Sequence, residues 1–412
     1  MATARSARRP QIMLVFGTRP EAIKMAPVAL ALERSESFER VVVVTAQHRE
    51  MLDQVLDLFG IEPDVDLNII QPRQTLTSVA TRALEGLSAV IEGAGPDAVV
   101  VQGDTTTTFA GALAAFYARV PVVHMEAGLR TNDACSPYPE EINRRLASQL
   151  ATLHLAATPA NRQNLLAENI AANRILVTGN TVIDALLDAV DLAPDYGMPA
   201  LAGLDSDRRR VLLVTAHRRE SWGEPLAAVG RAVAEIAATE PDVLVVFPLH
   251  KNPAVREAVM APLAGLDNVL LVEPVAYGGF ARLMRRADVI LTDSGGVQEE
   301  GPSLGKPVLV MRDVTERPEA VAHGAARLVG TDERAIVGGV RTLLHDADAY
   351  AAMANAVNPY GDGRAAQRTV AALDHLLRGA RRPDEFAPGL AAPKPPHPTR
   401  RPRGARRRAG AA

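Results

Sequence analysis

The sequence predicts an α/β protein made of two doubly wound domains, each with a parallel β-sheet covered by helices on both faces. Short apolar runs alternate with segments of helical character along almost the whole chain. Strands that are apolar on both faces and alternate with helices are typical of buried parallel sheets. The runs fall into two series, separated by residues 191–207, where prolines and glycines stand among acidic residues. At 412 residues the chain has the length expected of about two domains.

The first series begins near the N-terminus. Its expected strands are Gln11–Phe16, Val41–Thr45, Ala98–Gln102, Val120–Met125 and Leu153–Ala157. Its expected helices are Pro20–Glu33, Thr77–Glu92 and Thr105–Arg119. In sheets of this kind, ligands lie beyond the carboxyl ends of the strands, so the polar residues that follow each strand are the candidates for a site.

The second series repeats the pattern. Its expected strands are Val211–Thr215, Val243–Pro248, Val269–Val272, Asp288–Thr292 and Pro307–Met311. Its expected helices are Leu226–Ala238 and Phe280–Arg286, and a last helix, Ala365–Leu377, is expected to return to the first domain. The predicted first domain is therefore residues 11–190 with residues 360–380, and the predicted second domain is residues 191–359.

Both ends of the chain differ in composition from the rest. From Arg378 onward there are ten Lys or Arg residues against two Asp or Glu, in a segment rich in Pro and Ala that has no apolar period. This composition is typical of disorder, so residues 1–10 and 381–412 are predicted to be disordered extensions. The basic tail is interpreted as a solvated segment, and no nucleic-acid partner is expected.

The composition excludes several classes of protein. A single cysteine, Cys135, rules out a disulfide framework and a cysteine-based metal site. No apolar run is long enough to span a bilayer, and the run at residues 12–16 is too short for a signal peptide. We therefore expect a cytoplasmic protein that does not insert into membranes.

Residues 292–301, TDSGGVQEEG, have the pattern of an anion-binding turn. An apolar strand ends here, two glycines follow and a helix begins, so unpaired amides and the positive end of a helix dipole face the turn. Ser294 is a candidate N-cap, while Gly295 and Gly296 let phosphate oxygens approach the backbone. Glu300 and the glutamate before it are placed to accept hydrogen bonds from sugar hydroxyls. The pattern predicts a nucleoside diphosphate site, with an ordinary strand–helix turn as the alternative.

Two basic residues follow the first strand. Arg19 and Lys24 flank the start of the first helix, where Pro20 fits the first turn. Both side chains would face an anion at that helix N-terminus. The second glycine of a P-loop is missing, so the segment is not predicted to be one.

Acidic residues and a histidine follow other strands. Asp104 comes directly after one strand, although it could instead cap the threonine-rich helix that follows. Glu126 comes directly after a buried strand, where an unpaired carboxylate is rarely placed. Glu140 lies in the next loop, and Glu141 is its equal on composition. His217 follows a strand of the second half, where it could also be a structural histidine. Carboxylates in one half and anion-binding features in the other suit a nucleotide sugar held between two domains.

Together these residues resemble the non-hydrolysing UDP-N-acetylglucosamine 2-epimerase family. The resemblance runs from about residue 12 to residue 377. It rests on the motifs GTRPEAIKMAP, TAQHREMLDQVL, GDTTTT, HMEAGLRT, PEEINR, TGNTVIDAL, TAHRRESWG, LTDSGGVQEEGPSLGKPVLVMRD, TERPEA and NPYGDG. It implies a GT-B-like architecture, in which two Rossmann-like domains face each other across a cleft.

The resemblance also implies an activity. Family members interconvert UDP-N-acetylglucosamine (UDP-GlcNAc) and UDP-N-acetylmannosamine (UDP-ManNAc) by elimination and re-addition of UDP, through 2-acetamidoglucal. The product supplies N-acetylmannosamine (ManNAc) for cell-surface polysaccharide. The reaction needs no nicotinamide, which agrees with the absence of a G-x-G-x-x-G motif, and no metal or other cofactor is expected. A homodimer is also expected.

Matching the motifs places the family's functional residues on positions of this chain. The implied catalytic residues are Asp104, Glu126, Glu140 and His217. The implied substrate-binding residues are Arg19, Lys24, Phe280, Ser294, Gly295, Gly296, Glu300 and Arg317. A regulatory, allosteric site for a second UDP-GlcNAc falls on Gln47, Arg73, Gln74 and Arg218.

Three alternatives stay open. A hydrolysing epimerase shares the fold and the intermediate but releases UDP and free ManNAc. A GT-B glycosyltransferase would need an acceptor cleft, often with membrane-facing apolar and basic residues in the first domain, and the sequence has no such patch. A non-catalytic sensor of nucleotide sugars would not need three carboxylates in the first domain.

Overall fold

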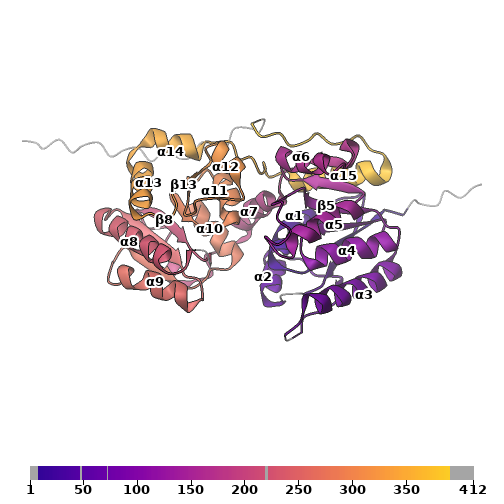
Figure 1. Ribbon diagram of the computed structural model, residues 1–412, viewed down its shortest axis with the longest axis horizontal. Helices are drawn as coiled ribbons and strands as arrows, with labels where there is room; N and C mark the ends of the chain where they lie inside the picture. Colours follow the sequence, from indigo (N-terminus) through magenta and orange to yellow (C-terminus); the bar gives the residue numbers. More distant parts are fainter. Residues whose placement is uncertain (1–7, 47–48, 72, 219–220, 390–412) are drawn as a thin grey trace, which may run out of the picture.

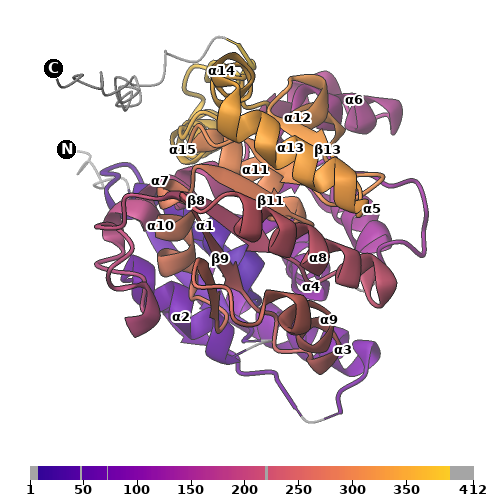
Figure 2. The same cartoon turned by 90° about the vertical axis from the view of Figure 1, so that its left-hand side faces the viewer.

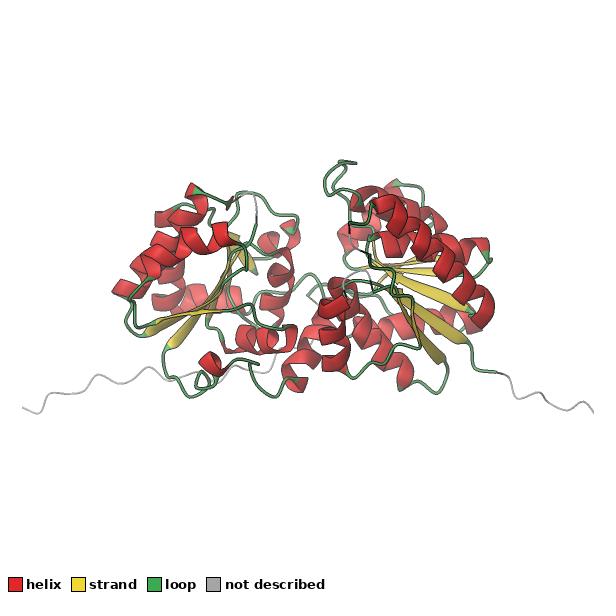
Figure 3. Ribbon diagram, turned by 90° about the horizontal axis from the view of Figure 1, so that it is seen from below, coloured by secondary structure: helices red, strands yellow, loops and turns green. Residues whose placement is uncertain are grey.

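The computed structural model describes residues 8–46, 49–71, 73–218 and 221–389. These residues form two α/β domains that stand side by side, with helix α7 (Thr181–Leu192) between them (Figure 1). Each domain has a parallel sheet with helices on both faces (Figure 3). The predicted fold class, two doubly wound parallel-sheet domains of the GT-B type, is therefore confirmed.

Among the described residues, the first sheet has seven parallel strands in the order β3-β2-β1-β4-β5-β6-β7. The strands are β1 (Gln11–Phe16), β2 (Glu39–Val44), β3 (Val65–Asp66), β4 (Ala98–Gln102), β5 (Val122–Ala127), β6 (Leu153–Ala156) and β7 (Ile175–Val177). The helices are α1 (Arg19–Glu33), α2 (Arg49–Phe59), α3 (Leu76–Ala94), α4 (Thr106–Tyr117), α5 (Glu140–Leu150), α6 (Pro159–Ala167) and the 3₁₀ helix η1 (Ala172–Arg174). The winding reverses between β1 and β4, where a ligand site is expected at the carboxyl ends of the strands.

The described part of the second domain has six parallel strands in the order β10-β9-β8-β11-β12-β13. The strands are β8 (Arg210–Thr215), β9 (Val243–Pro248), β10 (Val269–Val272), β11 (Val289–Thr292), β12 (Val308–Val310) and β13 (Ala326–Leu328). The helices are η2 (Pro199–Leu201), α8 (Glu224–Thr239), α9 (Pro253–Leu263), α10 (Tyr277–Arg286), α11 (Gly295–Ser303), α12 (Pro318–Ala322), α13 (Glu333–His345) and α14 (Ala347–Ala354). The winding reverses between β8 and β11. In Figure 2 this domain lies in front of the first.

Strand β1 shows why both faces of a sheet are covered. Ile12, Leu14 and Phe16 pack into one apolar cluster, while Met13 and Val15 point to the opposite face and pack into another. All five side chains are at most 1% exposed. A strand without a polar face is buried only between two layers of helices, so the apolar run itself requires a three-layer domain.

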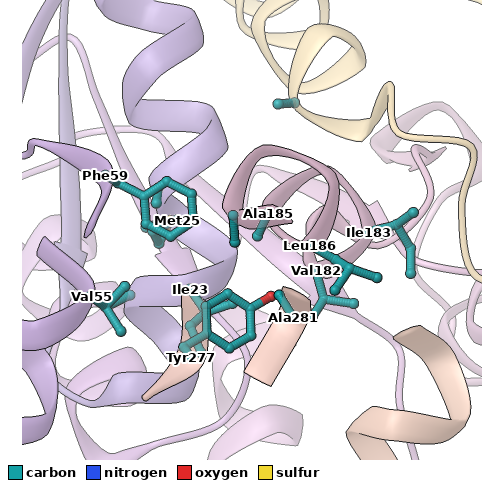
Figure 4. Packing of buried hydrophobic residues seen from close by; sticks show 14 of the residues in the cluster. Ile23, Met25, Val55, Phe59, Val182, Ile183, Ala185, Leu186, Tyr277 and Ala281 are labelled. Carbon is teal, nitrogen blue, oxygen red and sulfur yellow. The ribbon is translucent and has the colours of Figure 1, made fainter. Parts of the chain in front are cut away.

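Helix α7 ties the two domains together. It packs against α1 in the first domain and against α10 and α11 in the second. Figure 4 shows the apolar contacts at this boundary, where Ala185 and Leu186 of α7 lie near Ile23 of α1 and Tyr277 of α10. The chain returns through Tyr360, and α15 (Ala365–Arg378) then packs against α1 and α7.

Three short strands, β3, β7 and β13, were not predicted from the sequence. Each has two or three residues and lies at an edge of its sheet. A run this short carries no readable alternation of apolar and polar residues, so only the pairing with a neighbouring strand defines it.

The predicted disorder from residue 381 onward is wrong for residues 381–389. Phe386 is 4% exposed and packs beside edge strand β7, in a cluster that includes Val177. Its backbone N–H donates to the carbonyl oxygen of Val177 at 2.8 Å. One buried aromatic side chain and one backbone hydrogen bond dock a segment whose composition is typical of disorder. Residues 390–412 lie outside the described residues, as do residues 1–7.

The predicted disorder of the N-terminal extension is also wrong for its last residues. Arg8 donates to the carboxylate of Asp97 at 2.9 Å. The carbonyl oxygen of Pro10 accepts from the N–H of Glu39 at the same distance. The backbone bond extends the pairing of β1 with β2, and the ion pair fixes the segment beside β4.

Candidate active site

Glu126 stands where β5 loses its regular pairing. Its backbone φ is +57°, and the register between β5 and β6 shifts between Met125 and Ala127. A positive φ is uncommon outside glycine, and strained backbone of this kind collects at functional sites. The carboxylate reaches groups from neighbouring elements, because Oε2 accepts from Gln102 Nε2 at 2.5 Å and Oε1 accepts from Lys24.

Lys24 decides the ionisation of Glu126. Burial acts to raise the pKa of this carboxyl, but the charge and hydrogen bond of Lys24, with Arg317 nearby, leave the pKa below its ordinary value. Burial also acts to lower the pKa of Lys24, yet Glu126 and Glu299 raise that pKa overall. Each partner therefore holds the other in its charged form.

The pKa of Asp104 is shifted in the opposite direction from that of Glu126. It follows β4, and its Oδ2 accepts from Arg144 of α5. Burial raises the pKa of Asp104, and Arg144 opposes this effect while Glu126 reinforces it, so the pKa lies above its ordinary value. The N-cap of α4 is Thr105, whose side chain accepts from the N–H of Thr108 at 3.1 Å, so Asp104 is not the helix cap. Two neighbouring carboxyls with opposite shifts suit an acid–base pair.

The two glutamates at the start of α5 have different surroundings. Glu141 is fully buried, and its carboxylate accepts from the N–H groups of Thr131 and Asn132 at 3.0 and 3.3 Å. These bonds hold the preceding loop, so Glu141 has a structural role. Glu140 is half-buried, and no hydrogen bond or ion pair in the described part of the chain ties its side chain to another residue. Its carboxylate is therefore available to a ligand.

A histidine–aspartate pair joins the ends of β8 and β11 in the second domain. Nδ1 of His217 lies 2.8 Å from Oδ1 of Asp293. Oδ2 of Asp293 accepts from the backbone N–H groups of His217 and Arg218 at 2.7 and 2.8 Å. Burial acts to raise the pKa of Asp293, but His217 lowers it overall. The anchored carboxylate orients the imidazole and leaves Nε2 directed away from it.

The N-terminus of α11 forms the turn that was predicted to bind an anion. Ser294 occupies the N-cap position without a side-chain capping bond, and its N–H donates to Thr292 Oγ1 at 2.9 Å. Gly295 and Gly296 open the helix. A Cβ built on Gly295 would lie 3.5 Å from Nη2 of Arg218. A guanidinium and a helix N-terminus therefore stand together, and both favour an anion.

Glu300 faces the same turn from further along α11. A Cβ on Gly296 would lie 3.6 Å from its Oε2, while its Oε1 accepts from the hydroxyl of Tyr277 at 3.0 Å. Burial raises the pKa of Glu300 to about 7, and the Tyr277 hydrogen bond and the charge of Arg19 offset only part of that effect. Phe280 lies on the same helix as Tyr277 and packs half-buried against the apolar cluster.

Arg317 and Glu299 connect the second domain to the first. Nε of Arg317 donates to Oε1 of Glu299. Asn180, at the start of α7, donates to Oε2 of Glu299 at 2.9 Å and to Oε1 of Glu126 at 3.1 Å. Burial acts to lower the pKa of Arg317, but Glu299 and Glu126 raise it overall. The predicted residues Lys24, Glu126 and Arg317 therefore belong to one network.

The predicted regulatory residues are not joined by hydrogen bonds or ion pairs within the described residues. Gln47 lies outside those residues. Arg73 is exposed, with a φ of +57°, and the side-chain oxygen of Gln74 accepts from the N–H of Gln71 at 3.1 Å. Arg218 stands instead at the N-terminus of α11. The regulatory site stays a prediction.

Sequence reasoning did not assign three residues of the site. Asn180 follows β7, a strand too short to be predicted, so its place at a strand end was not visible. Glu299 was considered with Glu300, but the sequence gives no basis for deciding which of them faces the first domain. Asp293 carries a readable signal, because it directly follows a buried strand inside the glycine-rich motif.

Comparisons with known proteins show which family the chain resembles. A family model described as UDP-N-acetylglucosamine 2-epimerase matches residues 30–374. The UDP-N-acetylglucosamine 2-epimerase of Escherichia coli (strain K12) is 56% identical over 369 residues, which cover 88% of this chain and 98% of that protein. The protein of the same name from Salmonella typhimurium is 55% identical over 368 residues, with 88% and 98% covered.

Solved structures agree as well. The UDP-GlcNAc 2-epimerase from Neisseria meningitidis, bound to UDP-GlcNAc, matches with a TM-score of 0.78 and 48% identity, over 88% of this chain and 99% of that one. The UDP-GlcNAc 2-epimerase from Methanocaldococcus jannaschii, in complex with UDP-GlcNAc and UDP, matches with a TM-score of 0.71 and 33% identity, over 89% and 99%. The family model and these relatives cover most of the chain, and the chain belongs to the UDP-N-acetylglucosamine 2-epimerase family.

Proposed function

We propose that this protein interconverts UDP-GlcNAc and UDP-ManNAc reversibly, without net hydrolysis. The observation that carries the proposal is the carboxyl pair of the first domain, because the pKa of Asp104 is raised and that of Glu126 is lowered. Glu126 is linked through Asn180 to Glu299, which lies on the helix that begins with the anion-binding turn. The related proteins from N. meningitidis and M. jannaschii were solved with UDP-GlcNAc.

The proposed reaction begins at C1 of the sugar. The hydrogen on C2 is not next to a carbonyl, so its acidity is low and its removal cannot lead. When the C1–O bond breaks, its electron pair leaves with UDP and the ring gains oxocarbenium character. Loss of the C2 proton then gives neutral 2-acetamidoglucal. UDP adds back to C1, and a proton delivered to the opposite face of C2 completes the inversion.

We assign UDP to the second domain. The N–H groups of Gly295 and Gly296, beside the N-cap Ser294, face the diphosphate. Arg19, Lys24 and Arg317 supply positive charge to it. Glu300 accepts hydrogen bonds from the ribose hydroxyls. Phe280, on the same helix as Tyr277, completes the nucleotide site.

Two groups are needed for the chemistry at C2, because one fixed carboxylate cannot reach both faces of the ring. Glu126 is the proposed base, since Lys24 favours its ionised form. Asp104 is the proposed acid, since burial favours its protonated form. Glu140 is the third carboxylate of the site. His217, oriented by Asp293, stabilises charge on the departing phosphate oxygen.

Incubation with UDP-GlcNAc in deuterated water tests the function. Epimerisation places deuterium at C2 in both nucleotide sugars and keeps UDP attached at equilibrium. Release of UDP with free ManNAc identifies a hydrolysing epimerase. No turnover without an added acceptor identifies a glycosyltransferase or a sensor.

We further propose that the protein is a homodimer joined through α4 and α5. Phe116 and Tyr117 at the end of α4 are exposed, as are Ile142 and Leu146 on α5, and the two helices pack against each other. Large exposed apolar side chains on adjacent helices are typical of an interface. Light scattering after size-exclusion chromatography is expected to give the mass of a dimer, and Phe116→Glu is expected to give that of a monomer.

The predicted biological setting stays a prediction. No helix within the described residues is long and apolar enough to cross a membrane. The cytoplasmic location was expected from the composition of the sequence, and the supply of ManNAc for cell-surface polysaccharide follows only from the family resemblance. The activator site at Gln47, Arg73, Gln74 and Arg218 has the same standing, and its kinetic test is sigmoidal turnover of UDP-ManNAc that added UDP-GlcNAc makes hyperbolic.

A further inference from the structure

Asn180 contacts carboxylates from both domains through a single amide nitrogen. Its Nδ2 donates to Oε1 of Glu126 at 3.1 Å and to Oε2 of Glu299 at 2.9 Å. Its side chain is buried. A primary amide nitrogen carries two hydrogens, so both bonds form at once. Glu126 ends a strand of the first sheet, whereas Glu299 lies on α11 beside the second sheet.

Each carboxylate also has a cation of its own. Lys24 donates to Glu126, and Arg317 donates to Glu299. Within the described residues, Asn180 is the one side chain that hydrogen-bonds to both carboxylates. The two carboxylates are anions from different domains and repel each other. The two hydrogen bonds from the neutral amide between them offset part of that repulsion.

Asn180 is held in place through both its side chain and its backbone. Its Oδ1 caps α7 by accepting from the N–H of Val182 at 3.1 Å. Its backbone N–H donates to the carbonyl oxygen of Tyr360 at 2.6 Å, at the point where the chain returns to the first domain. Because the N-cap bond uses the oxygen, the NH₂ group must face the carboxylates.

A C-terminal segment fixes the strand that leads to Asn180. We call residues 381–389 the strap; they follow α15 and lie beyond the family match, which ends at residue 374. The N–H of Phe386 donates to the carbonyl oxygen of Val177 at 2.8 Å, and Glu385 accepts from the N–H of Val177 at 3.4 Å. The strap therefore binds both backbone groups of the last residue of edge strand β7.

The strap also touches Gly179, and Arg368 of α15 holds Thr178, so both residues between β7 and Asn180 have a contact from the C-terminal part of the chain. A Cβ on Gly179 would lie 3.6 Å from Cγ of Phe386, so the aromatic ring packs against this glycine. The guanidinium of Arg368 lies over the same ring, 5.6 Å from its centre, and Nη1 donates to the carbonyl oxygen of Thr178 at 3.2 Å. Each residue from Val177 to Asn180 is therefore held by a contact with the strap, with Arg368 or with Tyr360.

We propose that Asn180 is a positioning residue for the epimerisation: it aligns Glu126 with Glu299 across the domain boundary, and the strap holds Asn180 in place. This inference rests on the proposed function, in which Glu126 is the base. An aspartate of the same shape would not serve, because a third carboxylate would repel the other two.

Asn180→Asp and Asn180→Ser test the inference, since both keep an oxygen that can cap α7 and both remove the amide donor. We expect kcat to fall about 10–100-fold, as for loss of a hydrogen bond to a charged group. KM for UDP-GlcNAc and the affinity for UDP are expected to stay near their wild-type values. The acidic limb of the pH profile of kcat is expected to move to higher pH, because ionised Glu126 loses a hydrogen bond.

Asn252→Asp is the matched control. Asn252 caps α9 in the same way, with Oδ1 accepting from the N–H of Ala254 at 2.9 Å, but its side chain contacts neither carboxylate. We expect this variant to keep the wild-type kcat and pH profile. If Asn180→Asp does not fold by circular dichroism, Asn180→Ser carries the test, because it adds no charge.

Phe386→Ala tests the role of the strap. We expect this variant to lower kcat by a smaller factor than Asn180→Ser and to shift the pH profile in the same direction. The conservative variant Phe386→Leu is expected to keep most of the wild-type rate. A folded Phe386→Ala variant with the wild-type rate and pH profile would overturn the strap's role.

The remaining outcomes separate this inference from the proposed function. Folded Asn180 variants that keep the wild-type kcat and pH profile overturn the positioning role while the function stands. Wild-type protein that does not interconvert the two nucleotide sugars overturns the function itself.

Discussion

His124 and His154 stand opposite each other on strands β5 and β6, and neither ring reaches solvent. Nε2 of His124 lies 2.7 Å from the carbonyl oxygen of Gly103, whereas neither ring nitrogen of His154 has a hydrogen-bond partner within the described residues. Burial lowers the pKa of His124 to about 4 and that of His154 to about 3. The folded protein therefore keeps both rings neutral, and His124 has the structural role expected of a histidine inside an apolar strand.

Stability is expected to fall in acid because of these histidines. An unfolded histidine titrates near pH 6.5. As pH falls from there towards the folded pKa values, the unfolded chain binds protons that the folded protein excludes. Each histidine then removes about 1.4 kcal/mol from the free energy of unfolding per pH unit. His154→Phe is expected to flatten this dependence between pH 7 and pH 5 in urea denaturation, and the exposed His323→Phe is not. An equally steep fall in His154→Phe would contradict the argument.

Removing either first-domain carboxyl is expected to stop the chemistry at C2. Asp104→Asn and Glu126→Gln should each lower kcat by about 10²–10⁴-fold, the range for general acid–base groups. Glu140→Gln is expected to lower kcat by a factor in the same range, while the affinity for UDP changes little. The measurement is deuterium exchange at C2. Near wild-type exchange in all three variants would show that these residues are structural.

Glu141→Gln is the matched control for that series. It lies next to Glu140, but its carboxylate accepts from the loop before α5 and from Arg144 and Arg145 of the same helix. We expect the free energy of unfolding to fall by roughly 1.5–3 kcal/mol, the contribution of a hydrogen bond to a charged group, and the melting temperature to fall with it. The rate per folded molecule is expected to be retained.

Binding of UDP is expected to depend on the ionisation of Glu300. The ionised carboxylate accepts from ribose hydroxyls more strongly than the protonated carboxyl does, and the pKa of Glu300 is raised to about 7 by burial. Affinity should therefore fall as pH drops through about 7. Glu300→Gln should weaken binding above that pH by roughly 1 kcal/mol or more and reduce the pH dependence, as measured by calorimetry. Glu257→Gln, at an exposed site on α9, is the control, and unchanged affinity in Glu300→Gln would refute the ribose contact.

His217 and Asp293 are expected to act on the leaving group. His217→Asn should slow cleavage of the C1–O bond, so both epimerisation and trapped 2-acetamidoglucal should decrease. Asp293→Asn should have a similar but smaller effect, because it removes the carboxylate that orients the ring. Single-turnover release of UDP measures this step. The exposed Asp267→Asn serves as control, and a normal rate of UDP release in His217→Asn would exclude the role.

Charge at the diphosphate is expected to come from side chains and helix amides. Lys24 and Arg317 lie in the network beside Glu126, and Arg218 stands at the N-terminus of α11. Dialysis against EDTA is therefore expected to leave kcat unchanged. Loss of activity that magnesium restores would show that a metal ion supplies part of this charge.

The sequence by itself determined the class of fold and, through its motifs, the family. Strands such as Gln11–Phe16 and Val243–Pro248 are apolar on both faces, and that property alone requires helices on both sides of a sheet. The turn at residues 292–296 was equally predictable, because the strand end, the two glycines and the helix start are all local features, and the structure has all three.

Only the tertiary structure decided which side chains meet. Asn180 lies 54 residues from Glu126 and 119 from Glu299 in the sequence, so no local pattern joins them. The same is true of Phe386, which is buried beside edge strand β7. Its neighbour Glu385 lies 208 residues from Val177 in the sequence. Local periodicity reports how one segment is buried, whereas a hydrogen bond between distant segments depends on where the whole fold places both of them.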